Sequence, residues 1–171
     1  NGLLDCDQHG TFVAGVLAAQ PADDGFAGVA PGVRILSIRQ ASGHYGVFPD
    51  PPRNMPPQLR QHYQERPEGN QGNVVTLAKA VRMAADAGAT VINISQAACR
   101  PFGMDLGDGP LGAALHYAVH VRDAVVVTAA GNLTQACRTQ NAIHTVTSAA
   151  VPQSDVVTVV SPAHFDDLVL T

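Results

Sequence analysis

The stretch Val125-Val126-Val127-Thr128-Ala129-Ala130-Gly131-Asn132 predicts a strand that ends in small residues and an asparagine. The run over 124–129 is almost wholly apolar, rich in β-branched side chains, and about as long as one strand. Strands without a polar face are typical of parallel sheets covered on both sides. We therefore expect 124–129 to be buried inside such a sheet.

Outward from this strand, helical and strand patterns alternate. Apolar spacing predicts helices over 9–19, over 74–88 and from Pro110 onward, and strands over 33–39, 89–95, 156–160 and 168–170. Asp7 is the expected N-cap of the first helix and Gly88 the stop of the second. The alternation indicates an α/β fold of three layers, a parallel sheet with helices on both faces. Ligands bind such sheets at the carboxyl ends of the strands, here Ser95 and Ala130 onward.

The composition and charge of the chain argue against several classes of function. A chain of 171 residues favours one domain, 1–171, and 46% apolar with 14% charged residues predicts a compact globule. The net charge of −4 gives no basic stripe, so nucleic acid is not an expected partner. No apolar run reaches the roughly 18 to 20 residues that span a bilayer, so membrane contact would need a further segment. Both ends read as cut, and the Pro-rich stretch 41–73 is an expected surface loop.

His9-Gly10-Thr11-Phe12-Val13-Ala14-Gly15 opens the first predicted helix. This motif resembles the histidine motif of subtilases, the subtilisin-like serine proteases. The partial positive charge of a helix start disfavours imidazolium, which suits His9 as a general base. A lone histidine at this place would more often be a surface or capping residue.

The strand end at Asn132 carries a second resemblance. Subtilases place an asparagine there, whose side-chain amide donates to the oxyanion formed when serine attacks a carbonyl. By this resemblance Asn132 takes that role, and Ala129, Ala130 and Gly131 form a wall of the specificity pocket. The end of strand 89–95 resembles the segment beside bound substrate, so substrate contact is expected at Ser95, Gln96 and Ala97, where an extended peptide can pair with backbone. A turn or capping role is the alternative for Asn132, and an ordinary strand end for Ser95.

The other two members of the Asp, His, Ser triad are not found in context. Asp5 and Asp7 are so close to His9 in sequence that capping or loop roles are favoured over orienting its imidazole. Ser148, Ser154 and Ser161 lack the required surroundings. The sequence thus reads as part of a catalytic domain, and hydrolysis by residues 1–171 alone is not expected.

Short matches narrow the resemblance within the family. Asp5 to Thr11, Leu36 to Gln40, and Ile94-Ser95 followed by Cys99 resemble mycosins, the membrane-anchored subtilases of type VII secretion systems. The resemblance implies a polypeptide substrate, secretion-system components as partners, a cell-envelope location and no cofactor. The resemblance to mycosins also implies a Cys99–Cys137 disulfide and leaves Cys6 unpaired. The expected position of Cys99 and Cys137, each just beyond the end of one of two neighbouring strands, agrees with this pairing. Three reduced cysteines in a cytosolic chain are the alternative.

Three other functions remain open at this point: a noncatalytic subtilase-fold scaffold, a generic secreted subtilase, and a doubly wound domain that binds a small ligand. The last lacks a Gly-rich phosphate fingerprint. No metal site is expected. Four aspartates are interpreted as solvated loop carboxylates: Asp23, Asp24, Asp105 and Asp108.

Overall fold

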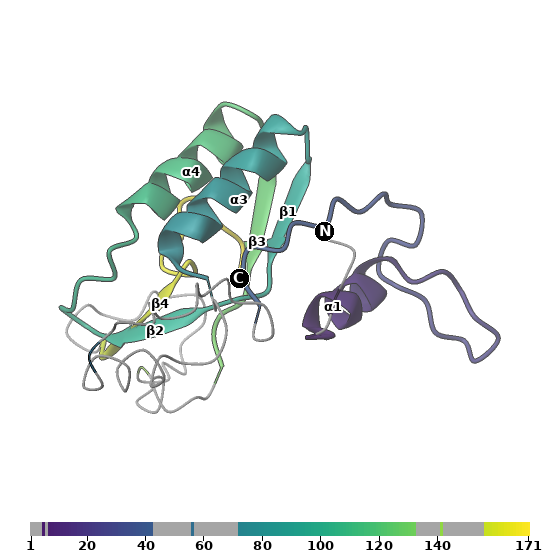
Figure 1. The fold of residues 1–171 in the computed structure, drawn as a ribbon. Coiled ribbons are helices and arrows are strands. Elements are labelled where there is room, and N and C mark those ends of the chain that lie inside the picture. The colour runs from purple at the N-terminus through teal and green to yellow at the C-terminus, as the bar shows by residue number, and fades with distance from the viewer. Residues whose placement is uncertain (1–4, 6, 43–55, 57–71, 133–140, 142–155) are drawn as a thin grey trace, which may run out of the picture. The chain divides into compact units, whose positions relative to one another are not determined.

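The computed structural model describes residues 5, 7–42, 56, 72–132, 141 and 156–171 (Figure 1). The chain divides into two compact units, Asn1–Thr76 and Leu77–Thr171, which are described in turn. The single domain expected over 1–171 stays a prediction, and most of the Pro-rich stretch 41–73 lies outside the described residues. No helix of the described residues is long and apolar enough to cross a membrane.

Unit 1 contains the helix α1 (His9–Ala18), as the sequence predicts. After a turn the chain comes back along the end of this helix, where the N–H groups of Val29 and Ala30 donate to the carbonyls of Val16 and Leu17. A Cβ atom at Gly28 would lie 2.5 Å from the backbone nitrogen of Ala19. Only glycine permits this close approach of the two backbone segments.

The start of α1 corrects the expected N-cap. Gln8 occupies that position in a left-handed conformation (φ 63°) and makes no side-chain cap. The Asp5 carboxylate instead accepts hydrogen bonds from the Thr11 N–H (2.6 Å) and hydroxyl (2.7 Å). Asp7 accepts a bond from the Ser42 hydroxyl at 2.8 Å. The left-handed turn between Asp7 and the helix thus leaves the capping to the more distant carboxylate.

The strand expected over 33–39 is wrong, because these residues have no regular secondary structure. Val33, Ile35 and Leu36 are 53%, 47% and 54% exposed. An alternating apolar pattern becomes a strand only when another strand pairs with it. The described residues of unit 1 contain no such partner.

Unit 2 contains the parallel pair β1 (Val91–Ile94) and β3 (Val125–Thr128), which confirms both predicted strands. On the other side of β3, a parallel bridge joins Val127 to Leu170, within the predicted strand 168–170. Burial alternates along β1 and β3, whereas the sequence led us to expect continuous burial. Within this unit the buried side chains are those facing the helices, since α3 and α4 lie side by side over one face of the pair (Figure 1).

The helices α3 (Val74–Asp86) and α4 (Gly109–His120) confirm the two predicted helices that cover this sheet. Their buried residues form stripes at helical spacing: Ala78, Val81, Ala84 and Ala85 in α3, and Leu111, Ala114, Leu115 and Ala118 in α4. Gly88 ends α3 with φ +83°, and the Ala89 N–H donates to the Ala84 carbonyl at 3.1 Å. This closure needs a left-handed residue, which explains why a glycine follows the helix.

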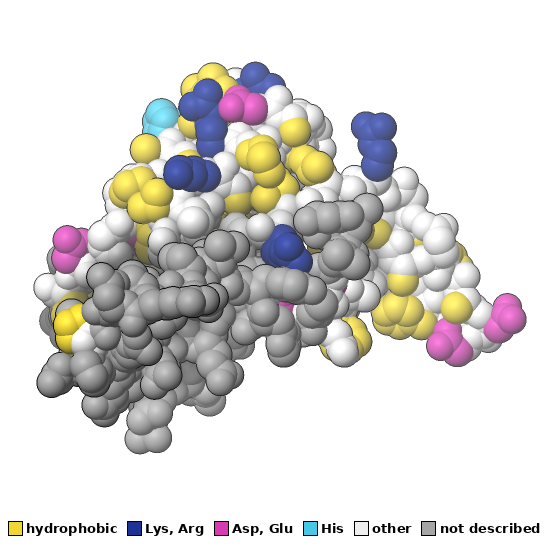
Figure 2. All heavy atoms as spheres, viewed as in Figure 1, with side chains coloured by type: hydrophobic (Ala, Val, Ile, Leu, Met, Phe, Trp, Pro, Cys, Tyr) yellow, Lys and Arg dark blue, Asp and Glu magenta, His cyan; other side chains and the backbone are white. Residues whose placement is uncertain are grey.

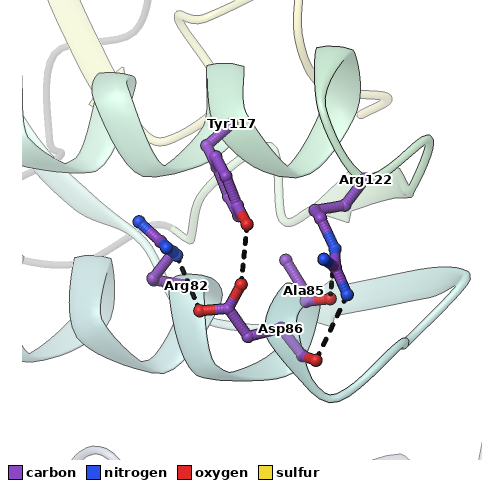
Figure 3. A network of polar contacts seen from close by, with 5 residues as sticks. All are labelled: Arg82, Ala85, Asp86, Tyr117 and Arg122. Carbon is purple, nitrogen blue, oxygen red and sulfur yellow. Dashed lines mark hydrogen bonds and ion pairs between the residues drawn. The ribbon is translucent and has the colours of Figure 1, made fainter.

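A polar network ties the carboxyl-terminal ends of α3 and α4 together (Figure 3). Asp86 accepts hydrogen bonds from the Tyr117 hydroxyl and from Arg82, both at 2.7 Å. The guanidinium of Arg122 donates to the carbonyls of Ala85 (3.1 Å) and Asp86 (3.2 Å), at the end of α3. Figure 2 shows basic side chains over these two helices at the top of the view. The cations offset the partial negative charge of the α3 terminus.

Unit 2 also contains an antiparallel ribbon of β2 (Ala98–Pro101) and β4 (Thr158–Ser161). The sequence predicts β4 approximately, as 156–160, but gives no sign of β2. The side chain of Asn141 holds the start of β4: its oxygen accepts from the N–H groups of Val157 and Thr158, and its amide donates to the Thr158 carbonyl.

A carboxylate–imidazole pair fastens the start of α4 to the turn after β4. Asp108 Oδ2 lies 2.6 Å from His164 Nε2, and its side chain is only 13% exposed, so the expectation of a solvated loop carboxylate is wrong for Asp108. The adjacent Phe165 ring fills the space where a Cβ of Gly112 would be, at 2.7 Å. Partial burial acts to raise the pKa of Asp108, but hydrogen bonding, chiefly from His164, outweighs it and holds the pKa below its usual value near 3.8.

We expect Asp108→Ala to lower the free energy of unfolding at pH 7 by about 1 to 2 kcal/mol, because it removes a partly buried, charge-assisted hydrogen bond. The folded-state pKa lies below the unfolded-state pKa, so the contribution is full above about pH 4 and is lost as pH falls through the folded-state value. Urea unfolding at pH 7 and in steps below pH 4 measures this difference. The exposed Asp167→Ala is the control, and a deficit for Asp108→Ala that grows on acidification would contradict the assignment.

Candidate active site

The carboxyl ends of β1 and β3 bring two predicted site segments together. The register pairs Ile94 with Thr128, and the Ala129 N–H donates to the Ile94 carbonyl at 3.1 Å. Residues 95–97 and 129–132 therefore leave the sheet at the same edge. This is the edge at which parallel sheets place ligands.

The first of these segments, 95–97, is mostly exposed and is held by a hydrogen bond at its beginning. Asn93, near the end of β1, donates from its side-chain amide to the Ser95 hydroxyl at 2.8 Å. Gln96 and Ala97 are exposed and belong to no strand. The chain then enters β2 at Ala98, so this short segment is held between two strands.

The second segment packs against the ribbon. Gly131 has φ +124°, and a Cβ built on it would lie 3.3 Å from Val160 Cγ1 of β4 and 4.0 Å from Cys99 Sγ of β2. The position therefore combines a backbone conformation that favours glycine with a neighbour at close distance. Asn132 follows directly and is exposed. The ribbon thus lies against the chain directly before Asn132.

Cys99, the cysteine of β2, is disulfide-bonded. It lies opposite Val160 in the ribbon and beside Gly131. Its predicted partner Cys137 and the third cysteine, Cys6, lie outside the described residues. The pairing of Cys99 with Cys137 stays a prediction.

In unit 1, His9 is the first residue of α1 and is exposed. Asp5 is turned toward the amide and hydroxyl of Thr11, and these hydrogen bonds lower the pKa of its carboxyl. Asp5 therefore acts on the backbone at the helix start, which confirms the capping role expected from its nearness in sequence. The role of His9 as a general base stays a prediction.

Comparison with known proteins decides the family. The profile of the subtilase family, peptidases of the S8 type, matches residues 1–164. The chain belongs to the subtilase family. Its α/β fold is that of the subtilisin-like proteases, as the solved structures described below confirm.

The curated relatives that this subtilase resembles over its whole length are mycosins. Mycosin-4 of Mycobacterium tuberculosis is 45% identical over 175 residues, covering 100% of this chain and 34% of the relative. Mycosin-1 of Mycolicibacterium smegmatis is 43% identical over 176 residues, covering 100% of this chain and 37% of the relative. The chain thus spans about a third of the length of these relatives.

Solved structures agree with this likeness. MycP1 from Mycobacterium smegmatis superposes with a TM-score of 0.75 at 42% identity, covering 100% of this chain and 43% of that chain. A chain of the periplasmic assembly of the ESX-5 inner membrane complex gives a TM-score of 0.75 at 37% identity, covering 99% of this chain and 44% of that chain. A protein similar to this subtilase therefore occurs in the periplasmic assembly of the ESX-5 inner membrane complex.

Sequence reasoning missed Val160 as a neighbour of the site. It lies in a four-residue strand whose partner, β2, is about sixty positions earlier in the chain. A valine in an apolar run carries no sign of such a long-range contact. The glycine at 131 was a usable signal, because an isolated glycine at a strand end often marks a close approach of backbone.

We expect Gly131→Ala to lower the free energy of unfolding by about 1 to 3 kcal/mol, since it adds both backbone strain and a close contact with Val160. Chemical denaturation compares it with Gly32→Ala, where a Cβ meets nothing within 4 Å. Adding Val160→Ala to the Gly131→Ala background relieves the contact but not the strain, so it should recover only part of the loss. A Gly131→Ala protein as stable as Gly32→Ala would contradict the packing described.

Proposed function

We propose that the full-length protein is a serine endopeptidase that cleaves peptide bonds by acyl transfer, and that residues 1–171 supply its general base and its oxyanion donor. The observation that carries the proposal is the shared edge of β1 and β3, where 95–97 and 129–132 leave the sheet together. Membership of the subtilase family supports it.

His9 is the proposed base. Its place as the first residue of α1 puts the imidazole where the partial positive charge of the helix start disfavours protonation. It takes the proton of the attacking serine and returns it to the leaving amine. The serine and its orienting aspartate are assigned to no residue of 1–171, so both come from elsewhere in the full-length protein.

Asn132 is the proposed oxyanion donor. Its amide would donate to the negative charge that develops on the carbonyl oxygen, and such a donor acts only if it is held in place before the reaction. The closeness of Val160 to the preceding residue, Gly131, supports such a restraint. The proposed wall of the pocket for the substrate side chain is formed by three small residues that match the subtilase motif, Ala129, Ala130 and Gly131.

The proposed substrate is an extended polypeptide that pairs with the backbone of Ser95, Gln96 and Ala97 as an added strand. Gln96 and Ala97 are exposed and none of the three residues is part of a strand, which supports this assignment. Main-chain bonds hold the scissile bond without requiring particular side chains.

The proposed setting is the cell envelope, with components of a type VII secretion system as partners. The likeness to mycosins and to a chain of the ESX-5 inner membrane complex supports this setting. Membrane attachment would come from a segment outside residues 1–171.

The proposed Cys99–Cys137 disulfide braces the same edge, because Cys99 Sγ lies beside Gly131. Closing a loop of this length contributes on the order of 3 to 4 kcal/mol by loop-entropy estimates. Peptide mapping of the oxidised protein without reduction should recover one fragment that joins the two cysteines. A fragment that joins Cys99 to Cys6 would contradict the pairing.

The catalytic roles are tested in the full-length protein. A fluorophosphonate probe should label its serine, and His9→Ala should abolish the labelling. Asn132→Ala should lower kcat about 10²- to 10³-fold with little change in KM, because the amide bonds mainly to the transition state. Peptide turnover measures both parameters.

Asn132→Asp is the matched variant, since it keeps the size of the side chain but removes the amide donor. It should be as impaired as Asn132→Ala, whereas an asparagine with only a turn role would tolerate it better. Equal labelling of wild type and His9→Ala would contradict the mechanism. A folded full-length protein that the probe does not label would favour the noncatalytic scaffold.

A further inference from the structure

The exposed side of α4 carries a pair of histidines that the proposed chemistry does not use. His116 and His120 are four residues apart, and both are exposed. Their ring centroids are 4.5 Å apart, with the ring planes at 51°. Residues four apart lie on one face of a helix, so the two imidazoles share one patch of surface.

Two imidazoles in this arrangement are suited to chelate one metal ion. Neutral imidazole nitrogen is a good ligand for Cu²⁺, Ni²⁺ and Zn²⁺, and Cu²⁺ is bound most tightly in the usual order of divalent ions. His120 is in the last turn of α4, where the partial negative charge of the helix end also favours a cation. Only side-chain rotations are needed, because the buried residues of α4 fix the backbone that carries both rings.

The polar residues next to the histidine pair form hydrogen bonds with α3. Tyr117 is turned toward Asp86, and Arg122 donates to the carbonyls at the end of α3 (Figure 3). The guanidinium of Arg122 is therefore directed at the end of α3 and not at the two imidazoles. Among the described residues, no third histidine, cysteine or carboxylate joins the pair to complete a cluster. Water would fill the remaining positions of a bound ion.

We propose that His116 and His120 form a surface site for one divalent first-row transition-metal ion, with Cu²⁺ the tightest of the series. The ion bridges one turn at the end of α4. Because it binds the folded helix and not the unfolded chain, it stabilises the folded state by mass action. The site is separate from the edge of β1 and β3 and does not depend on the proposed proteolysis.

The first experiment follows the imidazole signals of the full-length protein by NMR while substoichiometric Cu²⁺ is added. The resonances of His116 and His120 should broaden together and before those of the other histidines. Isothermal titration with Ni²⁺ then compares wild type with His116→Gln and His120→Gln. Each substitution should raise the dissociation constant for Ni²⁺ at least tenfold, because a single imidazole cannot chelate.

The matched control is the double variant H120Q/V121H, which keeps the number of histidines but spaces them five apart. Val121 is 62% exposed, so an imidazole there is accommodated. This variant should bind Ni²⁺ as weakly as His120→Gln. Binding equal to wild type in either single variant, or in the spacing variant, would overturn the proposal, as would prior broadening of another histidine.

Discussion

The backbone ladder between β1 and β3 is the interaction on which the arrangement of unit 2 depends. It begins with the bond from the Val125 N–H to the Thr90 carbonyl and continues to the bond from Ala129 to Ile94. The register puts both strand ends at one edge, and it also turns Val126 toward the helices. A slip of one residue would reverse the faces of the whole strand, so the buried stripes of α3 and α4 and the ladder fix the same register.

The stabilising contacts and the proposed site occupy opposite ends of this layer. At the amino-terminal end of the strands, the Schellman closure at Gly88 and the bonds from Arg122 satisfy the last carbonyls of α3. At the carboxyl end, the chain contains a left-handed glycine and exposed segments without regular structure. Such features cost stability locally, and the closely packed helices around Leu111 and Leu115, both almost fully buried, offset that cost.

The sequence predicts the elements whose signals are local and misses those that depend on distant partners. Helical spacing located α1, α3 and α4, and the rule that ligands bind at strand ends pointed to Ser95 and to Ala130 onward. The resemblance to subtilases then gave the segments 95–97 and 129–132. The ribbon partner of Cys99 is Val160, and no local pattern marks a pairing across that distance. The prediction of Asp7 as the N-cap was wrong for a similar reason. The left-handed turn at Gln8 decides which carboxylate reaches the helix start, and a glutamine gives little indication of that conformation.

The ribbon gives the strand end a property that the parallel sheet alone does not supply. Parallel strands position the chain only as far as their last bond, which is at Ala129, whereas Asn132 lies three residues beyond it. In the proposed endopeptidase the amide must be in place before charge develops, because a donor that has to reorganise loses much of its advantage. Val160 and Cys99 of the ribbon lie beside Gly131, the residue directly before Asn132, so the ribbon supports the chain beyond that last bond. The disulfide-bonded β2 therefore belongs, physically, to the same arrangement as the asparagine.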